Sequence, residues 1–319
     1  MTKVIVVGAG QWGKNLVRTY HELNALAAVV EADTKLQESL RITYPEIPVY
    51  SDYSQAIQIE DTVAVIIATP APTHFSLAKE ALLKGKDVFI EKPMTLSSKD
   101  AEELIRIAAE NQLILMVGHL LLYQPAIEKM KEAIVSGKIG RLYSLHQERM
   151  KLGRVRSVEN VLWSFGVHDL AVLLHLVEDT PSEVAVNGQR VVQPNVEDDV
   201  YVHIAFQNGV QAHLHNSWLW PEVRRRLVAI GSEGMLVYDE EKQTVTLHRK
   251  GIDSDLSNRE KGIEILYEDN VQPLTLECRH FLECVQFRKQ PRSDGYNGLG
   301  VIRILEQCSN LLQKGTTTK

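Results

Sequence analysis

Short apolar runs alternate with longer amphipathic stretches along the first part of the chain. The apolar runs have the length of buried strands: Val4–Val7, Leu26–Val30, Val63–Ala68, Val88–Ile90 and Leu113–Val117. The stretches between them carry apolar residues three and four positions apart: Gly13–Glu22, Leu36–Tyr44, Thr73–Leu83 and Ser98–Glu110. Continuous apolar strands joined by crossover helices are typical of a parallel sheet covered on both faces. We therefore predict an α/β protein whose first domain, residues 1–122, is doubly wound.

The pattern changes after the helical stretch Pro125–Ser136, where apolar and polar residues alternate over longer runs. These runs are Arg141–Lys151, Pro181–Val192, Asp199–Phe206, Val210–Leu219, Arg226–Ile230, Met235–Tyr238 and Thr244–His248. Alternation predicts a large open, mainly antiparallel sheet with one solvated face. Three further helices are expected at Val167–Val177, Leu274–Lys289 and Asn297–Leu312, and the last two could pack on either domain. We assign residues 123–319 to this second α/β domain.

One hairpin of the second domain can be predicted from its register. A two-residue turn at Asn208-Gly209 would pair Ile204 with His213 and mix the two faces. A three-residue loop with Gly209 in a G1 bulge pairs Phe206 with Val210 and keeps the apolar faces together. Three histidines then share the polar face: His203, His213 and His215. A solvated or partner-covered face explains them more simply than a metal site does.

The overall composition limits the possible partners. The chain has 319 residues, 44% of them hydrophobic and 24% charged, as in ordinary globular proteins, and its net charge of -6 disfavours nucleic acid. The three cysteines lack metal-ligand spacing and suit a reducing compartment. There is neither a secretory signal pattern nor an apolar stretch of the ~20 residues that a membrane span requires. We expect a cytoplasmic protein without a metal, membrane or nucleic-acid partner.

A glycine-rich segment, Gly8-Ala9-Gly10-Gln11-Trp12-Gly13, follows the first strand and opens the first helix. In that context G-x-G-x-x-G predicts a dinucleotide site: Gly8 allows a tight turn, Gly10 lets a pyrophosphate approach, and Gly13 allows close helix packing. The helix N-terminus supplies N–H groups to the anion. A nucleotide-hydrolase loop is a weak alternative, because its last position needs Ser or Thr and here is Asn15. A glycine turn without a ligand is the other alternative.

Acidic residues at the end of the second strand indicate which dinucleotide would bind. Glu31 lies where an acidic group binds the ribose hydroxyl of NAD and repels the extra phosphate of NADP. Asp33 is close enough to share or replace that role. The sequence therefore favours NAD.

A lysine stands at the carboxyl end of the strand Val88–Ile90, where open α/β sheets bind ligands. It belongs to the tripeptide Glu91-Lys92-Pro93, in which the proline keeps Lys92 out of helical geometry and allows a cis bond. A reactive lysine fits this position. A surface lysine before a proline turn is the alternative interpretation.

Taken in order, several motifs resemble the Gfo/Idh/MocA oxidoreductases. They are the glycine loop, Ala68-Thr69-Pro70 followed by His74, Glu91-Lys92-Pro93, Gly118-His119 with Tyr123 and Pro125, and Gly166-Val167-His168-Asp169. The resemblance spans essentially the whole chain. It implies a Rossmann domain followed by an α/β domain whose open sheet mediates homodimers or homotetramers. The nicotinamide cofactor contacts that we carry over are Gly8, Gly10, Gln11, Trp12, Gly13, Glu31, Thr69, Pro70, His74, Glu91, Lys92 and His119.

The resemblance also implies that Lys92 and His168 face the substrate carbon. Many members have an aspartate four residues before the histidine, but this chain has Ser164. Either Asp169 replaces it, or Lys92 carries the proton transfer while His168 orients the hydroxyl. A base for this step needs a pKa near the working pH, which burial or neighbouring cations can give a lysine. The catalytic candidates are Lys92, His168 and Asp169, and Ser164 also leaves open a non-catalytic NAD-binding regulator.

A cluster of cations suggests an anionic substrate. It consists of Arg149, Lys151, Arg154 and Arg156. Arginine binds phosphate through paired N–H groups, although a solvated strand edge would look the same in sequence. Arg149–Gly153, Glu159–Trp163 and His168-Asp169 resemble the branch that oxidises sugar nucleotides, including UDP-N-acetylhexosamines at C3. We expect substrate contacts from Tyr123, Arg149, Arg156, Asn160 and His168, with Trp218, Trp220 and Arg225 as weaker candidates; a free polyol such as inositol is the alternative substrate.

Overall fold

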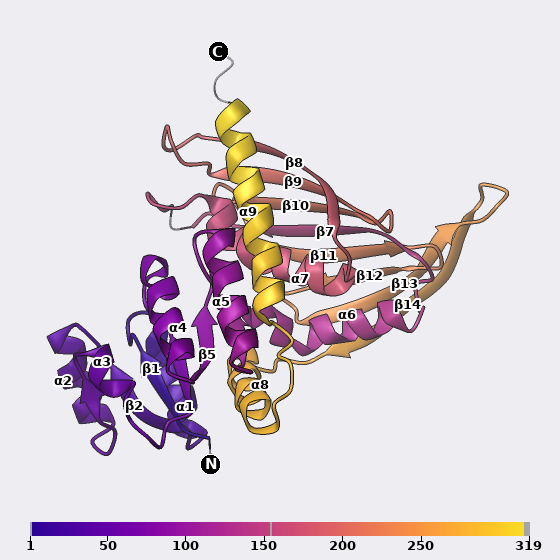
Figure 1. Cartoon of the computed structure of the whole chain (residues 1–319). Coiled ribbons are helices and arrows are strands. Elements are labelled where there is room, and N and C mark those ends of the chain that lie inside the picture. The colour runs from indigo at the N-terminus through magenta and orange to yellow at the C-terminus, as the bar shows by residue number, and fades with distance from the viewer. Residues whose placement is uncertain (1, 154, 316–319) are drawn as a thin grey trace. The chain divides into compact units, whose positions relative to one another are not determined.

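The chain forms two compact units in the computed structural model, which describes residues 2–153 and 155–315 (Figure 1). The first unit runs to Leu120 and takes in Gln272–Ile302, while the second comprises Leu121–Val271 and the chain from Arg303 onward. Of the two closing helices, α8 (Pro273–Phe287) belongs to the first unit. Helix α9 (Gly295–Gly315) begins in the first unit and continues into the second. Among the described residues, no helix is long and apolar enough to cross a membrane.

The first unit is built on a six-stranded parallel sheet with the order β3-β2-β1-β4-β5-β6. Its strands are β1 (Val4–Val7), β2 (Leu26–Val30), β3 (Val49–Tyr50), β4 (Ala64–Ile67), β5 (Asp87–Glu91) and β6 (Leu115–Gly118). Its helices are α1 (Gly13–Glu22), α2 (Thr34–Thr43), α3 (Tyr53–Ala56), the 3-10 turn η1 (Ala71–Thr73), α4 (His74–Leu83) and α5 (Ser98–Glu110). The predicted doubly wound domain is confirmed.

The central strands β1 and β4 are buried along their whole length, because helices cover both faces of the sheet. The strand order reverses between these two strands, and ligands of open α/β sheets bind at such a switch point, beyond the carboxyl ends of the strands. The glycine loop follows β1, Thr69 follows β4, and Glu91 ends β5. The topology thus brings the predicted motifs of the first unit to one edge of the sheet.

The second unit contains an eight-stranded sheet with the order β14-β13-β12-β11-β7-β10-β9-β8. Its strands are β7 (Leu142–Met150), β8 (Pro181–Gln189), β9 (Asp199–Phe206), β10 (Gln211–Ser217), β11 (Arg224–Gly231), β12 (Met235–Asp239), β13 (Thr244–Ile252) and β14 (Asn258–Glu268). Its other elements are the 3-10 turn η2 (Leu120–Tyr123), α6 (Pro125–Val135), the π-helical turn η3 (Leu162–Gly166) and α7 (Val167–Val177). β7 and β10 run parallel, and the other neighbouring strands run antiparallel, which confirms the predicted mainly antiparallel sheet.

The predicted hairpin between β9 and β10 has the G1-type loop. The Phe206 N–H donates to the Val210 carbonyl oxygen at 2.9 Å, and Ile204 stands opposite Ala212. Gly209 has a φ of +87°, the left-handed conformation that a glycine adopts without strain. The apolar residues of both strands therefore share the buried face of the sheet, where η3 lies against β10.

Six elements were not predicted from the sequence, among them the short 3-10 turns η1 and η2. β3 and α3 have only 2 and 4 residues, too few to show a period. The edge strand β14 is mostly exposed and rich in charge, so no apolar face marks it. The π-helical turn η3 continues directly into α7, and such turns leave no simple sequence signal.

Candidate active site

The glycine loop after β1 has the geometry of a phosphate cradle. Gly8 has a φ of +89°, and a Cβ on it would lie 2.9 Å from the Ala68 carbonyl oxygen. A Cβ on Gly13 would lie 2.1 Å from the Gly8 carbonyl oxygen, so this position needs glycine for packing. By contrast, a Cβ on Gly10 would meet no atom of the described residues within 4 Å. Gly10 therefore faces open space, as expected where a ligand's phosphates approach.

Helix α1 begins at this loop, where the Lys14 and Asn15 N–H groups donate to the Gly10 and Trp12 carbonyl oxygens at 3.2 and 2.8 Å. Trp12 precedes the helix and makes no side-chain capping bond, and the first turn carries no acidic residue. A helix start without a carboxylate retains its partial positive charge and free donors, which suit an anion. The loop and the helix start therefore fit the pyrophosphate of a dinucleotide.

Glu31, just beyond β2, is held against the glycine loop. Its Oε2 accepts from the Ala9 N–H at 2.7 Å and its Oε1 from the Asp33 N–H at 3.0 Å. Asp33 has a different task, since its Oδ1 caps α2 by accepting from the N–H groups of Lys35 and Leu36 at 2.9 and 3.0 Å. Of the two acidic candidates, the structure brings Glu31 to the loop and uses Asp33 as a helix cap.

Glu91, the last residue of β5, joins the glycine loop to the lysine turn. The Trp12 indole Nε1–H donates to its Oε1 at 2.6 Å, and the Lys92 N–H donates to its Oε2 at 3.3 Å. A Cβ on Gly118, the register partner of Glu91, would lie 3.0 Å from Oε2, so this glycine makes room for the carboxylate. Burial raises the pKa of Glu91 to about 7, although the Trp12 and Lys92 contacts oppose the rise.

Two histidines lie beside the Lys92-Pro93 turn, whose peptide bond is cis. His74 is buried between two turns, with Nδ1 2.8 Å from the Pro93 carbonyl oxygen and Nε2 2.8 Å from that of Thr69. Burial lowers its pKa. His119 is also buried, and burial together with the Lys92 ammonium lowers its pKa to about 3. His119 is therefore a neutral neighbour of Lys92, and His74 fixes the turns on which Thr69 and Lys92 stand.

A buried acid of the first unit was not predicted from the sequence. Glu277 of α8 is 0% exposed, and its two carboxylate oxygens have no hydrogen-bond partner among the described residues. Burial, and after it the charge of Glu91, raises the pKa of Glu277 well above the ordinary value. The sequence signal was present, because Glu277 shares the period of the buried Phe281 and Cys284.

In the second unit, His168 is half-buried at the start of α7, and Asp169 follows it in the first turn. Asp169 is fully buried, with Oδ1 accepting from Arg149 Nε at 2.8 Å and Oδ2 accepting from Asn216 Nδ2 at 2.9 Å. Burial raises the pKa of Asp169, and the Arg149 guanidinium opposes the rise. The structure thus brings together Arg149 and Asp169, which were predicted for different roles.

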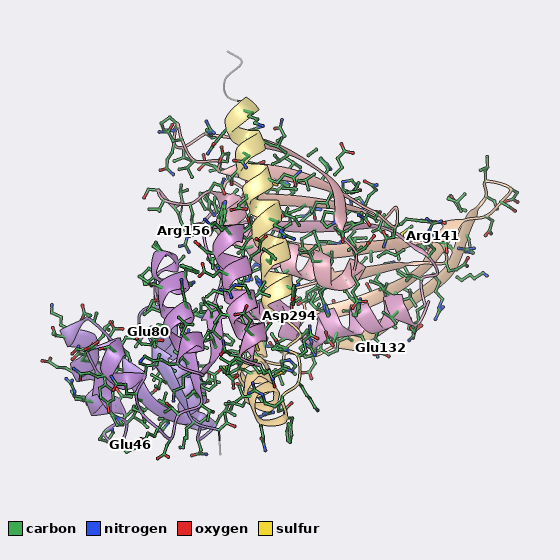
Figure 2. All side chains as sticks on the ribbon, in the orientation of Figure 1. Glu46, Glu80, Glu132, Arg141, Arg156 and Asp294 are labelled. Carbon is green, nitrogen blue, oxygen red and sulfur yellow. The ribbon has the colours of Figure 1, made fainter. Side chains whose placement is uncertain are left out.

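The other predicted substrate contacts lie in varied settings. Arg156, labelled in Figure 2, is exposed and pairs with Glu159 at 3.0 Å, while Arg154 lies outside the described residues. Asn160 accepts from the Trp163 N–H at 3.1 Å and donates to Glu197 Oε2 at 2.8 Å. Tyr123 is buried.

Two further predicted cofactor contacts belong to the first unit. Gln11 of the glycine loop is exposed, and Pro70 precedes η1.

The histidines of the open sheet face contact other polar side chains. His203 Nδ1 lies 2.7 Å from His213 Nδ1, and His215 pairs with Asp199 at 3.1 Å. Across the described parts of the chain, no three His, Cys, Asp or Glu side chains gather as metal ligands. These histidines belong to the open face of the sheet.

Comparisons with known proteins identify the family. Residues 2–119 match the oxidoreductase family with an NAD-binding Rossmann fold, and residues 127–237 match the Gfo/Idh/MocA C-terminal domain. The chain belongs to the Gfo/Idh/MocA oxidoreductases. It is therefore an NAD-binding oxidoreductase, and the resemblance first seen in its motifs is confirmed.

Two relatives with named activities are similar to most of the chain. A UDP-N-acetylglucosamine 3-dehydrogenase from Acidithiobacillus ferrooxidans is 26% identical over 301 residues, which cover 93% of each chain. Its solved structure has a TM-score of 0.87 and covers 98% of both chains at 25% identity. A scyllo-inositol 2-dehydrogenase (NAD(+)) from Bacillus subtilis is 26% identical over 245 residues, or 72% of this chain and 69% of that protein.

Proposed function

We propose that this oxidoreductase transfers hydride between NAD and a secondary alcohol or ketone of a sugar, with a UDP-N-acetylhexosamine oxidised at C3 as the favoured substrate. The observation that carries the proposal is the double contact of Glu91 with Trp12 and with the Lys92 main chain. These contacts fix the lysine turn to the cradle that fits a pyrophosphate. A cofactor bound in that cradle and an ammonium poised for acid-base work are thereby parts of one site.

The bound dinucleotide supplies the hydride chemistry, and the protein supplies position and proton transfer. In our proposal Lys92 takes the proton of the alcohol during oxidation and returns it during reduction. Neutral His119 beside Lys92 does not add a second positive charge, so it does not compete for the proton near pH 7. His168 is proposed, from the family resemblance, as the partner of the substrate hydroxyl.

We propose NAD in preference to NADP because of Glu31. The main-chain N–H groups of Ala9 and Asp33 hold its carboxylate at the edge of the loop. A fixed negative charge there accepts hydrogen bonds from a ribose and repels a phosphate on the same ribose. Asp33 contributes charge nearby, although its own oxygen is used to cap α2.

Two observations bear on the substrate in opposite directions. The relative that matches 93% of this chain is named for a UDP-N-acetylglucosamine, which favours a nucleotide sugar. Arg149, however, is 8% exposed and pairs internally with Asp169 and Glu240, so its guanidinium is not presented to a diphosphate. That pairing keeps a free polyol such as inositol as the second candidate, in line with the inositol dehydrogenase among the relatives.

The test is reduction of NAD by a panel of UDP-, dTDP- and GDP-sugars and free polyols, with wild type, Lys92→Ala and the exposed control Lys84→Ala. We expect turnover with a UDP-aminosugar, loss of turnover in Lys92→Ala with nearly unchanged affinity for NAD, and normal activity in Lys84→Ala. Normal activity in Lys92→Ala would exclude the assignment of this lysine. Dinucleotide binding without turnover on any substrate would support a regulator instead.

We also propose that the protein self-associates through the open face of the second sheet, as the family resemblance implies. That face carries a hollow lined by His146, Tyr201, His203, His213, His215 and Trp220. Tyr201 stacks on His215 at 3.8 Å, and Trp220 meets the same imidazole edge-on at 5.6 Å. Light scattering tests the assembly: a homodimer or homotetramer is expected, and a strict monomer would contradict it.

A further inference from the structure

Four polar side chains stand side by side at one end of the second sheet. Arg149 on β7 is the register partner of Asn216 on β10 and of Arg225 on β11. Glu240 follows β12, and its N–H donates to the Arg225 carbonyl oxygen at 3.0 Å. We call Asn216, Arg149, Arg225 and Glu240 the polar row. It crosses four neighbouring strands on the face that α7 covers.

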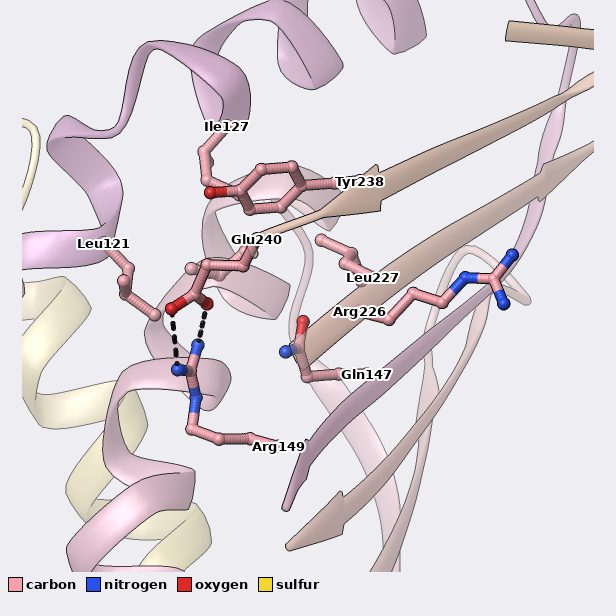
Figure 3. A pocket seen from close by; sticks show the side chains of 9 residues that line it. Leu121, Ile127, Gln147, Arg149, Arg226, Leu227, Tyr238 and Glu240 are labelled. Atoms are coloured by element: carbon pink, nitrogen blue, oxygen red, sulfur yellow. Dashed lines mark hydrogen bonds and ion pairs between the residues drawn. The ribbon is translucent and has the colours of Figure 1, made fainter. Parts of the chain in front are cut away.

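Arg149 is the centre of the polar row and is fully engaged within the protein. Its Nη1 and Nη2 donate to Glu240 Oε1 and Oε2 at 3.2 and 2.7 Å, a two-bond contact seen in Figure 3. Its Nε donates to Asp169 Oδ1 at 2.8 Å. Arg225 adds a bond from its Nη1 to Glu240 Oε1 at 3.0 Å. These contacts come from three different nitrogens held in one plane, a geometry that the single nitrogen of a lysine ammonium does not reproduce.

The polar row reaches the start of α7 through Asp169. The second oxygen of Asp169 accepts from Asn216 Nδ2 at 2.9 Å, so two adjacent strands hold one carboxylate. Asn216 also fits closely against the turn before the helix, because a Cβ on Gly166 would lie 2.6 Å from its Oδ1. Successive side chains of a helix point about 100° apart. Fixing Asp169 therefore fixes the rotation of the first turn and, with it, the direction of His168.

We propose that Arg149 is a positioning residue that orients His168 through Asp169, and that it is not a ligand of substrate phosphate. This inference rests on the proposed function, in which His168 meets the substrate hydroxyl. It differs from the expectation drawn from the sequence, where Arg149 belongs to a cluster of phosphate-binding cations. Glu240, which the sequence did not indicate, becomes the residue that orients Arg149.

The charges of the polar row suggest a variant that separates orientation from stability. Two arginines, Arg149 and Arg225, face two carboxylates, Asp169 and Glu240, so the group is balanced. Removing Arg149 alone leaves a buried negative charge, which destabilises a protein strongly. The double variant Arg149→Met/Glu240→Gln removes one charge of each sign and keeps the balance. It still lacks the bond from Arg149 Nε to Asp169.

The experiment compares wild type, Arg149→Lys, Arg149→Met/Glu240→Gln and the control Glu264→Gln, whose carboxylate accepts from Arg249 in an exposed pair. For each we measure kcat, KM, the pH profile of kcat, the melting temperature, and the imidazole NMR signal of His168, assigned with His168→Asn. In Arg149→Lys we expect kcat to fall about 100-fold with KM for the nucleotide sugar nearly unchanged, as misplacement of a catalytic group predicts. The double variant, which also lacks the bond to Asp169, should lose kcat to a similar extent.

Three results would overturn the inference: a rise in KM confined to nucleotide sugars, recovery of kcat together with stability in the double variant, or an unchanged His168 signal in Arg149→Lys. If wild type turns over no sugar at all, the proposed function fails. The NMR measurement then still decides the positioning role: a His168 signal that moves in Arg149→Lys and not in Glu264→Gln supports it, and one that does not move refutes it.

Discussion

The carboxyl group of Glu91 should make the stability of the first unit depend on pH near neutrality. Burial raises its pKa from 4.5 to about 7. The folded protein therefore holds this proton more tightly than the unfolded chain does, so the stabilising contribution is complete at low pH. It is lost as the pH rises through about 7. The variant Glu91→Gln removes this titration, and its amide oxygen can still accept from the Trp12 indole.

The size of the effect follows from the pKa difference. At ~1.36 kcal/mol for each pKa unit, the rise corresponds to about 3 kcal/mol. Wild type should therefore lose about 3 kcal/mol of unfolding free energy relative to Glu91→Gln as the pH rises from acidic to mildly alkaline values. Most of this change should fall between about pH 5 and pH 8. Titrations shared by both proteins cancel in the difference.

Trp12 provides a local signal for this measurement, because the other three tryptophans, Trp163, Trp218 and Trp220, lie in the second unit. Subtracting the emission of Trp12→Phe isolates the indole that donates to Glu91. Urea unfolding at several pH values gives the free-energy difference, and emission of the native protein should show a midpoint near pH 7 that Glu91→Gln lacks.

The matched control is Glu110→Gln, which removes an exposed carboxylate bound to Arg106. It should leave both the stability difference and the Trp12 midpoint where they are in wild type. Parallel stability curves for wild type and Glu91→Gln, with no Trp12 midpoint above pH 5, would refute the reasoning. The carboxylate would then be solvated in spite of its position beneath the loop.

Three further outcomes can be checked directly. Gly13→Ala should fail to fold normally, because its Cβ would lie 2.1 Å from a main-chain oxygen, whereas Gly10→Ala should keep its melting temperature and lose affinity for NAD in calorimetry. Glu31→Gln should improve binding of NADP relative to NAD, and an unchanged ratio of dissociation constants would argue against a role of this charge. Asp87→Asn should cost about 1 to 2 kcal/mol in urea unfolding, since buried Asp87 pairs at 2.7 Å with Arg288, whose side chain is 46% exposed, and an unchanged stability would show that the pair contributes nothing.

The fold was largely predictable because most helices and strands show a characteristic spacing of apolar residues and a characteristic length in the sequence. β1, β2 and α1 have the predicted bounds, since buried parallel strands are continuous apolar runs and the helix has a clear amphipathic face. The hairpin at Gly209 was predictable because a shift of one residue would have turned an apolar face to solvent. The edge strand β14 was not, since exposed strands need no apolar pattern.

The site was predictable where the backbone dictates the residue and not where partners come from distant strands. Glycines and the lysine turn carry their geometry in the local sequence, so their place at the sheet edge followed from the strand order. The burial of Arg149 did not follow, because its partners Asp169 and Glu240 are 20 and 91 positions away. A cation next to other cations resembles a phosphate site in sequence, and only the fold shows that its bonds are already used.

In both units, an acidic residue stands next in sequence to a catalytic candidate and is held by hydrogen bonds from distant residues. Glu91 precedes Lys92 and is held by Trp12, while Asp169 follows His168 and is held by Arg149 and Asn216. In each case the acid next in sequence to a catalytic candidate anchors the local main chain through its own hydrogen bonds. Both oxygens of Asp169 already accept hydrogen bonds from the sheet, so Asp169 is poorly suited to replace the acid that is absent at Ser164. We therefore propose Lys92 as the group that moves the proton, with His168 orienting the hydroxyl.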